Sequence, residues 1–583
     1  DNFRSTVVAA LEFEQKLNFI TEGLRFKALA SFKNWSSTTN SASAGWNKYH
    51  LQDFSVDDNG VYSFVTRLQN ESGGEVSTDL KPGVANSGDR RFYFQAIMDY
   101  NRTFGKHDVN AMFIYNQDEL VTQLFSGDLI AALPKRKQGV AARLSYAYDG
   151  KYLAEVNMGY NGSENFAKGH RWGFFPSIAV GYNISEEAFF EPLKNVFSNM
   201  KIRASWGLVG NDNIGGARFV YMPTINLTGT GYTTGLDGDI TYKGPVYSRY
   251  GNPEVTWEVG KKVNVGLDLQ LFNSLNLTMD YFHETRTDIF QERGTIPQYL
   301  GTAGTKVFGN LAAMKNQGFD FAADFNKKIG KDWFISFKGT FTYAHNEITK
   351  YDESPKYAFQ SKVGQSANIP SIMISDGLFK DPDDVKNSNQ QIGGNLSAGD
   401  IKYVNISKLY GYDDDIVDIS DWVWAKNPTV PEIVYGFGPS IRWKNLDFSF
   451  FFQGVAKVSL VMSDFHPFGD NSLRNVLTWI ADDRWSPDNQ NINATYPRLT
   501  RDTSVNNTQR SDYWLRNAAF IKLKNAEIGY TYKNMRFYVS GMNLATFSPF
   551  KHWDPEQGGG NGLKYPTQRV FNFGFQMTIN NNR

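Results

Sequence analysis

The last segment of the chain, residues 569–583, alternates strictly between apolar and polar side chains. One side carries Phe571, Phe573, Phe575, Met577 and Ile579, and the other carries Asn572, Gly574, Gln576 and Thr578. This period of two predicts a strand. A soluble sandwich would bury the apolar face in a core, whereas a membrane barrel would turn it to lipid and leave Asn572, Gln576 and Thr578 facing a wet lumen. The segment alone leaves both interpretations open.

Similar alternating stretches of about ten residues, the length of a tilted membrane strand, recur along the chain. Tight turns join them in pairs at 105–108, 149–150, 273–274, 444–445 and 533–534. Between the pairs lie long connections at about 36–90, 119–137, 209–256, 291–315, 346–431, 457–516 and 544–567. Loops beyond about 15 residues are rare in compact soluble domains, while outer-membrane barrels combine short periplasmic turns with long extracellular loops. The alternation therefore predicts an all-β fold, a transmembrane antiparallel β-barrel.

The number of strands adds a parity argument. We count about 17 strands, from roughly 3–16 to 568–579, so the first and last strands run in the same direction. Bacterial single-chain barrels have an even number of strands, and an open sheet edge in lipid leaves unpaired backbone groups. We therefore expect residues 1–583 to form the C-terminal barrel portion of a larger protein.

Composition narrows the remaining classes of function. The formal net charge of the 583 residues is +0, so no basic surface for nucleic acid is expected. The chain has no cysteine, which excludes a thiol nucleophile and cysteine-bound zinc within it. Aromatic residues make up 15% of the sequence, as suits a barrel with a ring-rich outer surface.

Several stretches closely resemble the SusC-type (RagA/SusC) TonB-dependent outer-membrane transporters of Bacteroidetes. They follow one another in the same order and cover most of the chain. They include YNGSENFAKGHRWGFFPSIAVGYNISEEAFF at 160–190, MKIRASWGLVGNDNIG at 200–215, NPEVTWEVGKKVNVGLDLQLF at 252–272 with MDYFHETRTDIF at 279–290, DRWSPDNQNINATYPRL at 483–499, YWLRNAAFIKLKNAEIGYTY at 513–532, FYVSGMNLATF at 537–547 and WDPEQGGGNGLKYPTQRVFNFGFQMTI at 553–579.

The resemblance implies a 22-stranded barrel in the bacterial outer membrane. In that family an N-terminal plug fills the barrel, a TonB box takes energy from the inner membrane, and a SusD-like lipoprotein covers the extracellular mouth. The complexes import oligosaccharides or, in some members, oligopeptides. The plug, the TonB box and about five strands are expected outside these 583 residues.

Ring-bearing connections are the candidate ligand-binding sites, because flat rings stack on sugars or pack against peptide side chains. The candidates are Trp35, Trp46, Tyr49, Tyr232, Trp422, Trp424 and Trp479. For any one of these rings, loop packing or contact with a lid lipoprotein is the simpler interpretation.

The acidic stretch 412–421 is a candidate calcium loop, with oxygen ligands from Asp413, Asp415, Asp418 and Asp421. Related proteins commonly read Gly-Asp-Gly followed by Ile-Asp in this region. Here aspartates replace those turn glycines, so a solvated acidic loop is the alternative. No cofactor is otherwise required.

No arrangement typical of catalysis stands out, and we expect no enzyme. The seven histidines are scattered, without a helical His-x-x-x-His pair for zinc. The first hypothesis for function is therefore TonB-dependent import of oligosaccharides or oligopeptides, with a SusD-like lid as partner. The alternatives are a passive outer-membrane channel and a soluble, multi-sandwich glycan-binding protein.

Overall fold

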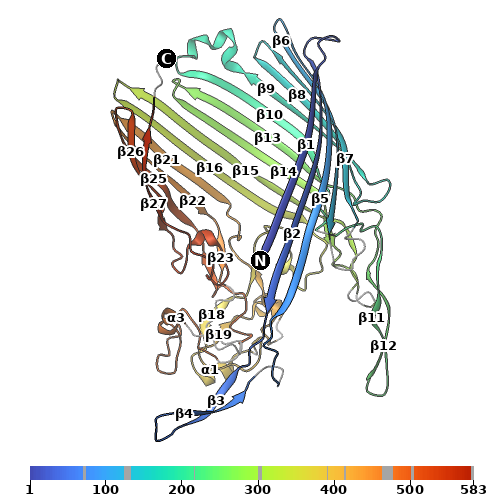
Figure 1. Cartoon of the computed structure of the whole chain (residues 1–583), viewed down its shortest axis with the longest axis vertical. Coiled ribbons are helices and arrows are strands. Elements are labelled where there is room, and N and C mark those ends of the chain that lie inside the picture. Colours follow the sequence, from blue (N-terminus) through green and yellow to red (C-terminus); the bar gives the residue numbers. More distant parts are fainter. Residues whose placement is uncertain are drawn as a thin grey trace.

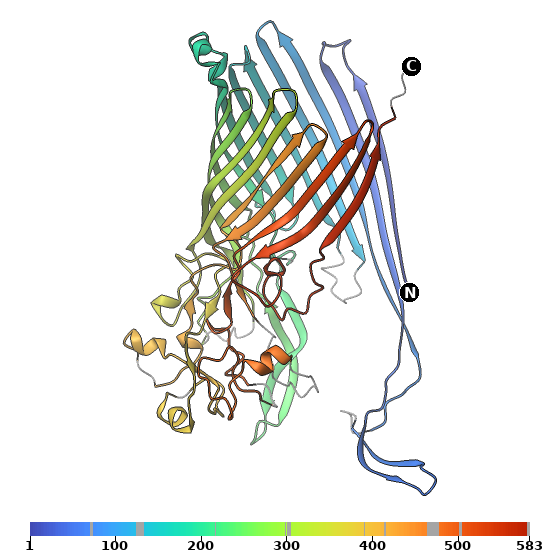
Figure 2. The ribbon, with the colours of Figure 1, turned by 90° about the vertical axis from the view of Figure 1, so that its left-hand side faces the viewer.

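One large antiparallel sheet curves round a central space and forms most of the molecule (Figures 1 and 2). The computed structural model describes residues 1–69, 74–123, 133–215, 217–297, 299, 305–389, 391–412, 415–462, 477–500 and 504–579. The sheet contains 17 strands, each paired with its neighbours in chain order, so the predicted antiparallel barrel topology and strand number are confirmed. Among the described residues, no helix is both long and apolar enough to span a membrane.

The strands of the sheet are β1 (Asn2–Lys16), β2 (Leu24–Ser43), β5 (Lys81–Phe104), β6 (His107–Gln123), β7 (Lys135–Tyr148), β8 (Tyr152–Ser163), β9 (Trp172–Asn183), β10 (Phe197–Asn211), β13 (Glu258–Leu271), β14 (Leu275–Glu292), β15 (Phe308–Ile329), β16 (Trp333–Lys350), β21 (Ile433–Trp443), β22 (Leu446–Ala456), β25 (Phe520–Tyr532), β26 (Met535–Phe547) and β27 (Val570–Met577).

Short turns close the strand pairs at one end of the sheet, the upper end in Figure 1. The predicted turns lie where expected, and Asp149, Asn273, Lys444 and Lys533 have the positive φ values, 51–53°, that tight hairpins require. The boundaries of two long connections were wrong by eight residues or more, because residues 308–315 belong to β15 and the connection 36–90 is shorter than predicted. Residues 36–43 and 81–90 continue β2 and β5 instead of forming loop, because their backbones pair with each other from Ser36 opposite Gly88 to Ser43 opposite Lys81.

The long connections gather at the other end and contain the small elements (Figure 2). Two-stranded pairs are β3 (Tyr49–Val56) with β4 (Tyr62–Leu68), β11 (Thr224–Thr234) with β12 (Ile240–Arg249), β17 (Ser371–Ile372) with β20 (Val423–Trp424), β18 (Ser375–Leu378) with β19 (Ile401–Tyr403), and β23 (Ser459–Val461) with β24 (Leu515–Asn517). The helices are α1 (Pro382–Asn387), α2 (Ile406–Leu409) and α3 (Thr478–Asp482), with 3₁₀ turns η4 (Ala358–Gln360), η5 (Ile419–Asp421) and η6 (Pro555–Gln557). Two further 3₁₀ turns, η1 (Ile184–Glu186) and η2 (Ala188–Leu193), lie at the turn end.

The outer face of the sheet is apolar. On the closing strand β27, Phe571, Phe573 and Phe575 are 61%, 83% and 55% exposed, so no second sheet covers them. Large apolar side chains are also exposed at outward-facing positions of other strands, for example Val156 on β8 and Val265 on β13. This arrangement overturns the sandwich alternative, which requires the apolar face to be buried between sheets.

The largest buried apolar cluster lies outside the sheet, among the long connections. It joins the connections 351–432, 457–519 and 548–569, and its members include Met373, Ile401, Leu460, Trp514 and Phe550. Hydrogen bonds satisfy many of the polar groups that this packing buries, for example Trp514 Nε1, which donates to Asn507 O at 2.8 Å. We call these three connections the cap domain.

A buried ion pair holds two parts of the cap domain together. Asp400 is fully buried, and its carboxylate accepts hydrogen bonds from Arg498 Nε at 2.7 Å and Nη2 at 3.0 Å. Asn507 Nδ2 donates a third bond at 2.8 Å. The buried carboxylate of Asp400 depends on these bonds. Loss of Arg498 would leave its negative charge uncompensated in the core.

Lys522 ties the last connection of the cap domain to the sheet. Its side chain is 1% exposed, and Nζ lies 2.7 Å from Asp554 Oδ2 and 2.5 Å from Glu556 Oε2. Lys524 Nζ adds a contact of 3.0 Å to Glu556 Oε1. Partial burial raises the pKa of both carboxyl groups, but the hydrogen bonds and positive charge of Lys522, together with the other neighbours of each carboxyl, outweigh this effect and leave each pKa below its ordinary value.

Acidification is therefore expected to loosen the connection 548–569. Because the pKa of each carboxyl is lowered in the folded state, its stabilising contribution is complete above its ordinary pKa and is lost as the pH falls through the lower folded pKa. Hydrogen exchange of residues 548–569, corrected for intrinsic rates, should be constant between pH 8 and 5.5 and should rise below about pH 4.

Lys522→Met is the matched variant. Asp554 then loses its cation and Glu556 keeps only Lys524, so exchange in 548–569 should be faster at pH 7 and should slow in part when acid neutralises the two carboxylates. Exchange that is independent of pH from 7 to 3 in the unsubstituted protein would contradict this role of the ion pairs.

Candidate functional site

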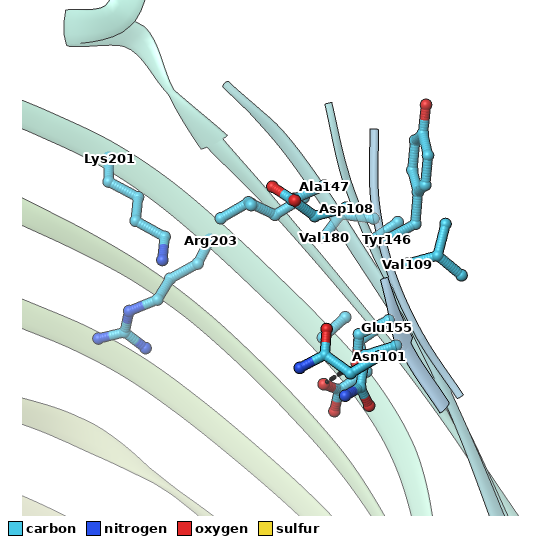
Figure 3. A pocket seen from close by; sticks show the side chains of 15 residues that line it. Asn101, Asp108, Val109, Tyr146, Ala147, Glu155, Val180, Lys201 and Arg203 are labelled. Carbon is cyan, nitrogen blue, oxygen red and sulfur yellow. Dashed lines mark hydrogen bonds between the residues drawn. The ribbon is translucent and has the colours of Figure 1, made fainter. Parts of the chain in front are cut away.

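The inner face of the sheet carries the polar and charged side chains that could contact a solute or another protein segment. The alternation places them opposite the apolar outer face. Figure 3 shows one part of this inner wall, a hollow of about 440 Å³, where Asn101, Glu155, Lys201 and Arg203 lie on the opposite side of the strands from Tyr146. Ser145 Oγ donates to Glu155 Oε2 at 2.8 Å within this hollow.

Near the turn end, three arginines each bridge two carboxylates from neighbouring strands. Arg203 of β10 contacts Asp268 of β13 at 3.1 Å and Asp280 of β14 at 2.6 Å. The planar guanidinium suits such multiple contacts, so each cluster links three adjacent strands on the inner face.

The other two clusters have the same composition. Arg25 of β2 contacts Glu14 of β1 and Asp99 of β5, and Arg536 of β26 contacts Asp447 of β22 and Glu527 of β25. The Arg203 and Arg536 clusters each have one more negative than positive charge, whereas Lys27 also pairs with Glu14, at 3.2 Å, and balances the charge of the Arg25 cluster. The turn end of the lumen is therefore lined by charged groups that are fixed in ion pairs.

Toward the cap domain, two hollows lie side by side and share Pro431. The first, of about 280 Å³, is lined by residues that include Glu284, Arg286, Asn316 and Asn346. The second, of about 510 Å³, is lined by residues that include Gln453, Ser459, Phe520, Glu556 and Gly559. Both combine amides, carboxylates and apolar surface, so each offers hydrogen-bond donors and acceptors beside apolar contacts.

The predicted lumen-facing residues of β27 lie on the inner face. Asn572 pairs with Ser540 of β26 and lines a hollow with it, and Gln576 pairs with Arg536. Thr578 follows the end of β27, where its backbone N–H donates to Asn534 O at 2.9 Å.

The predicted ligand-binding rings do not form one site. Trp35 is half-buried within β2, while Trp46, Tyr49 and Tyr232 are exposed on the projecting β3–β4 and β11–β12 regions. Trp46, Tyr49 and Tyr232 are 74%, 54% and 71% exposed.

The remaining predicted rings belong to the cap domain. Trp422 packs against its buried cluster, and Trp424 Nε1 donates to Ser361 O at 2.9 Å. Their packing agrees with the simpler interpretation given to each ring. Trp479 lies in α3, but its side chain is outside the described part of the structure.

A cluster of four rings that the sequence reasoning missed is more accessible. Tyr357 and Phe359 stack on each other and on Tyr412 and Tyr410, with ring centroids 4.6–5.4 Å apart. Tyr410 and Tyr412 are 60% and 53% exposed. The available signal was the pair of tyrosines flanking Gly411, whose φ of 86° allows both rings to turn to one side.

The candidate calcium ligands are engaged with the protein itself. Asp421 is buried and its carboxylate accepts from the backbone N–H groups of Ser407 and Asp418, at 2.8 and 2.9 Å. Asp418 caps η5, Asp415 is exposed near Lys408, and Asp413 lies outside the described residues. Within the described part, no three acidic or histidine side chains are grouped as metal ligands, and calcium binding stays a prediction.

Comparisons with known proteins agree with this architecture. TonB-dependent receptor P3 of Formosa agariphila is 25% identical over 99% of this chain and 58% of the relative. TonB-dependent receptor SusC of Bacteroides thetaiotaomicron is 27% identical over 75% of this chain and 43% of the relative. The chain thus spans less than two thirds of the length of these relatives.

Solved structures support the fold. The structure of the RagAB peptide transporter matches 99% of this chain and 62% of the solved chain, with a TM-score of 0.68 and 20% sequence identity. The RagAB peptide importer in the 'open-open' state matches with a TM-score of 0.69 and 19% identity over the same shares. At this identity the likeness establishes the fold alone.

The family model described as "TonB dependent receptor-like, beta-barrel" matches residues 10–544. The resemblance inferred from the sequence motifs is confirmed. The chain belongs to the TonB-dependent receptor β-barrel family, whose members are outer-membrane proteins.

Proposed function

We propose that the chain is the barrel portion of a bacterial outer-membrane importer that takes up oligosaccharides or oligopeptides. The observation that carries the proposal is the division of one sheet into an apolar outer face and a charged inner face, with a folded cap domain at one end. An apolar exterior suits lipid, and a polar interior suits a hydrated solute path. No step of this function requires covalent chemistry.

Further strands are proposed to close the cylinder between β1 and β27. In the described structure β1 pairs only with β2, and every residue of β1 is exposed. Unpaired N–H and C=O groups within hydrocarbon cost several kcal/mol each, so an open edge is unfavourable in a membrane. We propose that the same additional portion of the protein supplies a plug and a TonB box.

A SusD-like lipoprotein is proposed to cover the cap domain. Support comes from the similarity to SusC and to a RagAB transporter, together with the exposed rings of the cap domain and of the β3–β4 region. Large exposed apolar groups on ordered loops are typical of protein or ligand contacts. Ligand would be enclosed between the lid and the barrel mouth and released inward when TonB displaces the plug.

Asn316 and Gln453 are the proposed contacts for the polar groups of a passing oligomer. Each side chain lines one of the two adjoining hollows, and their amides offer both donors and acceptors. Asn346, in contrast, already accepts hydrogen bonds from Ser366 Oγ and the Ala367 N–H.

Energy dependence separates an importer from a passive channel. Uptake of a labelled oligosaccharide or oligopeptide mixture by the native bacterium should fall at least about tenfold when an uncoupler collapses the inner-membrane gradient, because release depends on TonB. The whole protein should also show little conductance in a planar bilayer. Large conductance with uptake that is insensitive to the uncoupler would establish the passive channel instead.

Substitution of Asn316 and Gln453 tests the ligand path. Asn316→Ala with Gln453→Ala should reduce uptake at limiting ligand by about thirtyfold, since each lost hydrogen bond contributes about 1 kcal/mol. Asn18→Ala, in the exposed β1–β2 turn at the opposite end of the sheet, is the matched amide control and should leave uptake unchanged. Equal uptake by the double variant and the control, at equal surface abundance, would exclude these hollows from the path.

The membrane orientation of the sheet predicts that an introduced arginine destabilises the protein far more on the outer face than on the inner face. Val265→Arg places a charge on the outer face and should lower the free energy of unfolding in bilayers by about 2–4 kcal/mol. Thr278→Arg points inward beside Asp268 and should cost much less. Urea titration in phospholipid vesicles measures both values, and equal losses would contradict the assignment of faces.

A further inference from the structure

One connection at the turn end of the sheet forms structure of its own. Residues 184–196, between β9 and β10, form η1 and η2, whereas the turns at 105–106, 444–445 and 533–534 contain two residues each. Figure 1 shows this segment projecting beside the ends of β9 and β10. We call residues 184–196 the rim segment.

Glu187 fixes the rim segment to the outer face of the sheet. Its carboxylate accepts from the hydroxyl groups of Tyr152 at 2.7 Å and Tyr182 at 3.4 Å, and it pairs with Lys151 at 3.3 Å. The two tyrosine rings stack with a centroid distance of 5.2 Å and lie on the same outward side as the exposed Val180. The start of the rim segment therefore lies against the lipid-facing side of the wall.

Phe190 provides a second contact on the same side. It is 4% exposed, and its ring packs edge-on against Phe197 of β10 with centroids 6.4 Å apart. Phe197 pairs with Leu271 of β13, which shares the outward face with Val265. These two contacts place Glu187 and Phe190 on the outward side of the wall, while Ser185 Oγ of η1 donates to Asn199 Oδ1 of β10 at 3.0 Å and anchors the start of the segment to the strand end.

The rest of the rim segment presents apolar side chains without a protein cover in the described structure. Phe189, Leu193 and Val196 are 68%, 49% and 41% exposed. Phe272, at the neighbouring β13–β14 turn, is also exposed, and its backbone N–H donates to Val196 O at 2.8 Å. Together these residues continue the outer apolar surface beyond the strand ends.

The rim segment lies next to a row of rings at the turn end of the wall. His107, Tyr148, Tyr152 and Tyr182 follow one another across β6 to β9, with successive centroids 5.0–6.4 Å apart. Trp333 and Trp443 stack near the turn ends of β16 and β21. Such rings mark the level of the lipid headgroups in membrane barrels.

We propose that the rim segment lies in the membrane interface, with Phe189 and Leu193 inserted at the boundary between headgroups and acyl chains of the periplasmic leaflet. Glu186, Glu191 and Lys194 alternate with these apolar residues, so their charged groups remain in the headgroup layer. The proposal rests on the outer-membrane location of the family. It assigns the rim segment a lipid surface as its partner, and makes Glu187 the residue that positions it.

Site-specific labelling tests the proposal, because this chain contains no cysteine. The Phe189→Cys substitution is made in the whole protein, with any cysteines elsewhere replaced, and the new thiol is labelled with bimane. The labelled protein is then reconstituted into phosphatidylethanolamine–phosphatidylcholine vesicles. Quenching by a lipid labelled with doxyl at acyl carbon 5 should be within about twofold of that for Val180→Cys on the outer wall. Quenching by iodide on both sides of the membrane should be at least about threefold weaker than for Leu236→Cys, which is fully exposed in the β11–β12 connection.

The outcomes are distinct. Strong iodide quenching with weak lipid quenching at Phe189→Cys would overturn the proposal, and so would protection from both quenchers, which would show that protein covers the rim segment. If Val180→Cys also failed to contact the lipid quencher, the membrane location itself would be wrong.

Glu187→Ala, introduced into the labelled Phe189→Cys protein, tests the positioning role. Lipid quenching should fall by at least about twofold while the heat-dependent mobility shift in SDS, a measure of barrel folding, is retained. Unchanged quenching would overturn the role of Glu187.

Discussion

The pairing of backbone groups between neighbouring strands is the constraint on which the rest of this structure depends. A wall one residue thick that separates lipid from a hydrated interior has no core in which to hide an unpaired N–H or C=O group. Each strand must therefore form backbone hydrogen bonds with its neighbours along its whole length. The side chains on one face then contact lipid, and those on the other face contact water or protein. The alternation of apolar and polar residues in β27 follows directly from this requirement.

The same constraint explains where the protein places its compact core. Inside the sheet, side chains on the inner face are polar and are joined by clusters such as Arg203 with Asp268 and Asp280, which link three strands without burying apolar area. Conventional packing occurs in the cap domain, where Trp514 and Ile401 are fully buried and the Asp400–Arg498 pair is enclosed. Wall and cap domain are thus stabilised by different interactions, the first by hydrogen bonds and ion pairs and the second by hydrophobic burial.

The wall was predictable from sequence because its signals are local. Period-two alternation and turns such as Asp149–Gly150 depend on residues close together in the chain. They indicate the number of strands and which side chains point outward and which point inward. The ends of β2 and β5 were not predictable in this way, since polar residues such as Ser36 and Ser41 are kept in strand conformation by pairing with residues of the neighbouring strand that are distant in sequence.

The candidate site was less accessible to the same reasoning because its geometry is made by contacts distant in sequence. Ring size alone points to Trp422 and Trp424 as ligand contacts, yet packing of the cap domain encloses them in part, while Tyr410 and Tyr412 become the exposed surface of a ring cluster. The composition of the acidic stretch predicts metal ligands. Asp421, however, bonds to the backbone of Ser407, fourteen positions earlier, a contact that only the folded connection creates.

The composition of the cap domain has a consequence for the order in which the protein acquires its final form. Its core draws residues from three connections, and Phe550 comes from the last of them, after β26. Strands added one after another from β1 onward would leave this core without the connection 548–569 until β26 had formed. The cap domain would then consolidate after almost all of the described sheet, and a folded cap domain would report that β26 is in place.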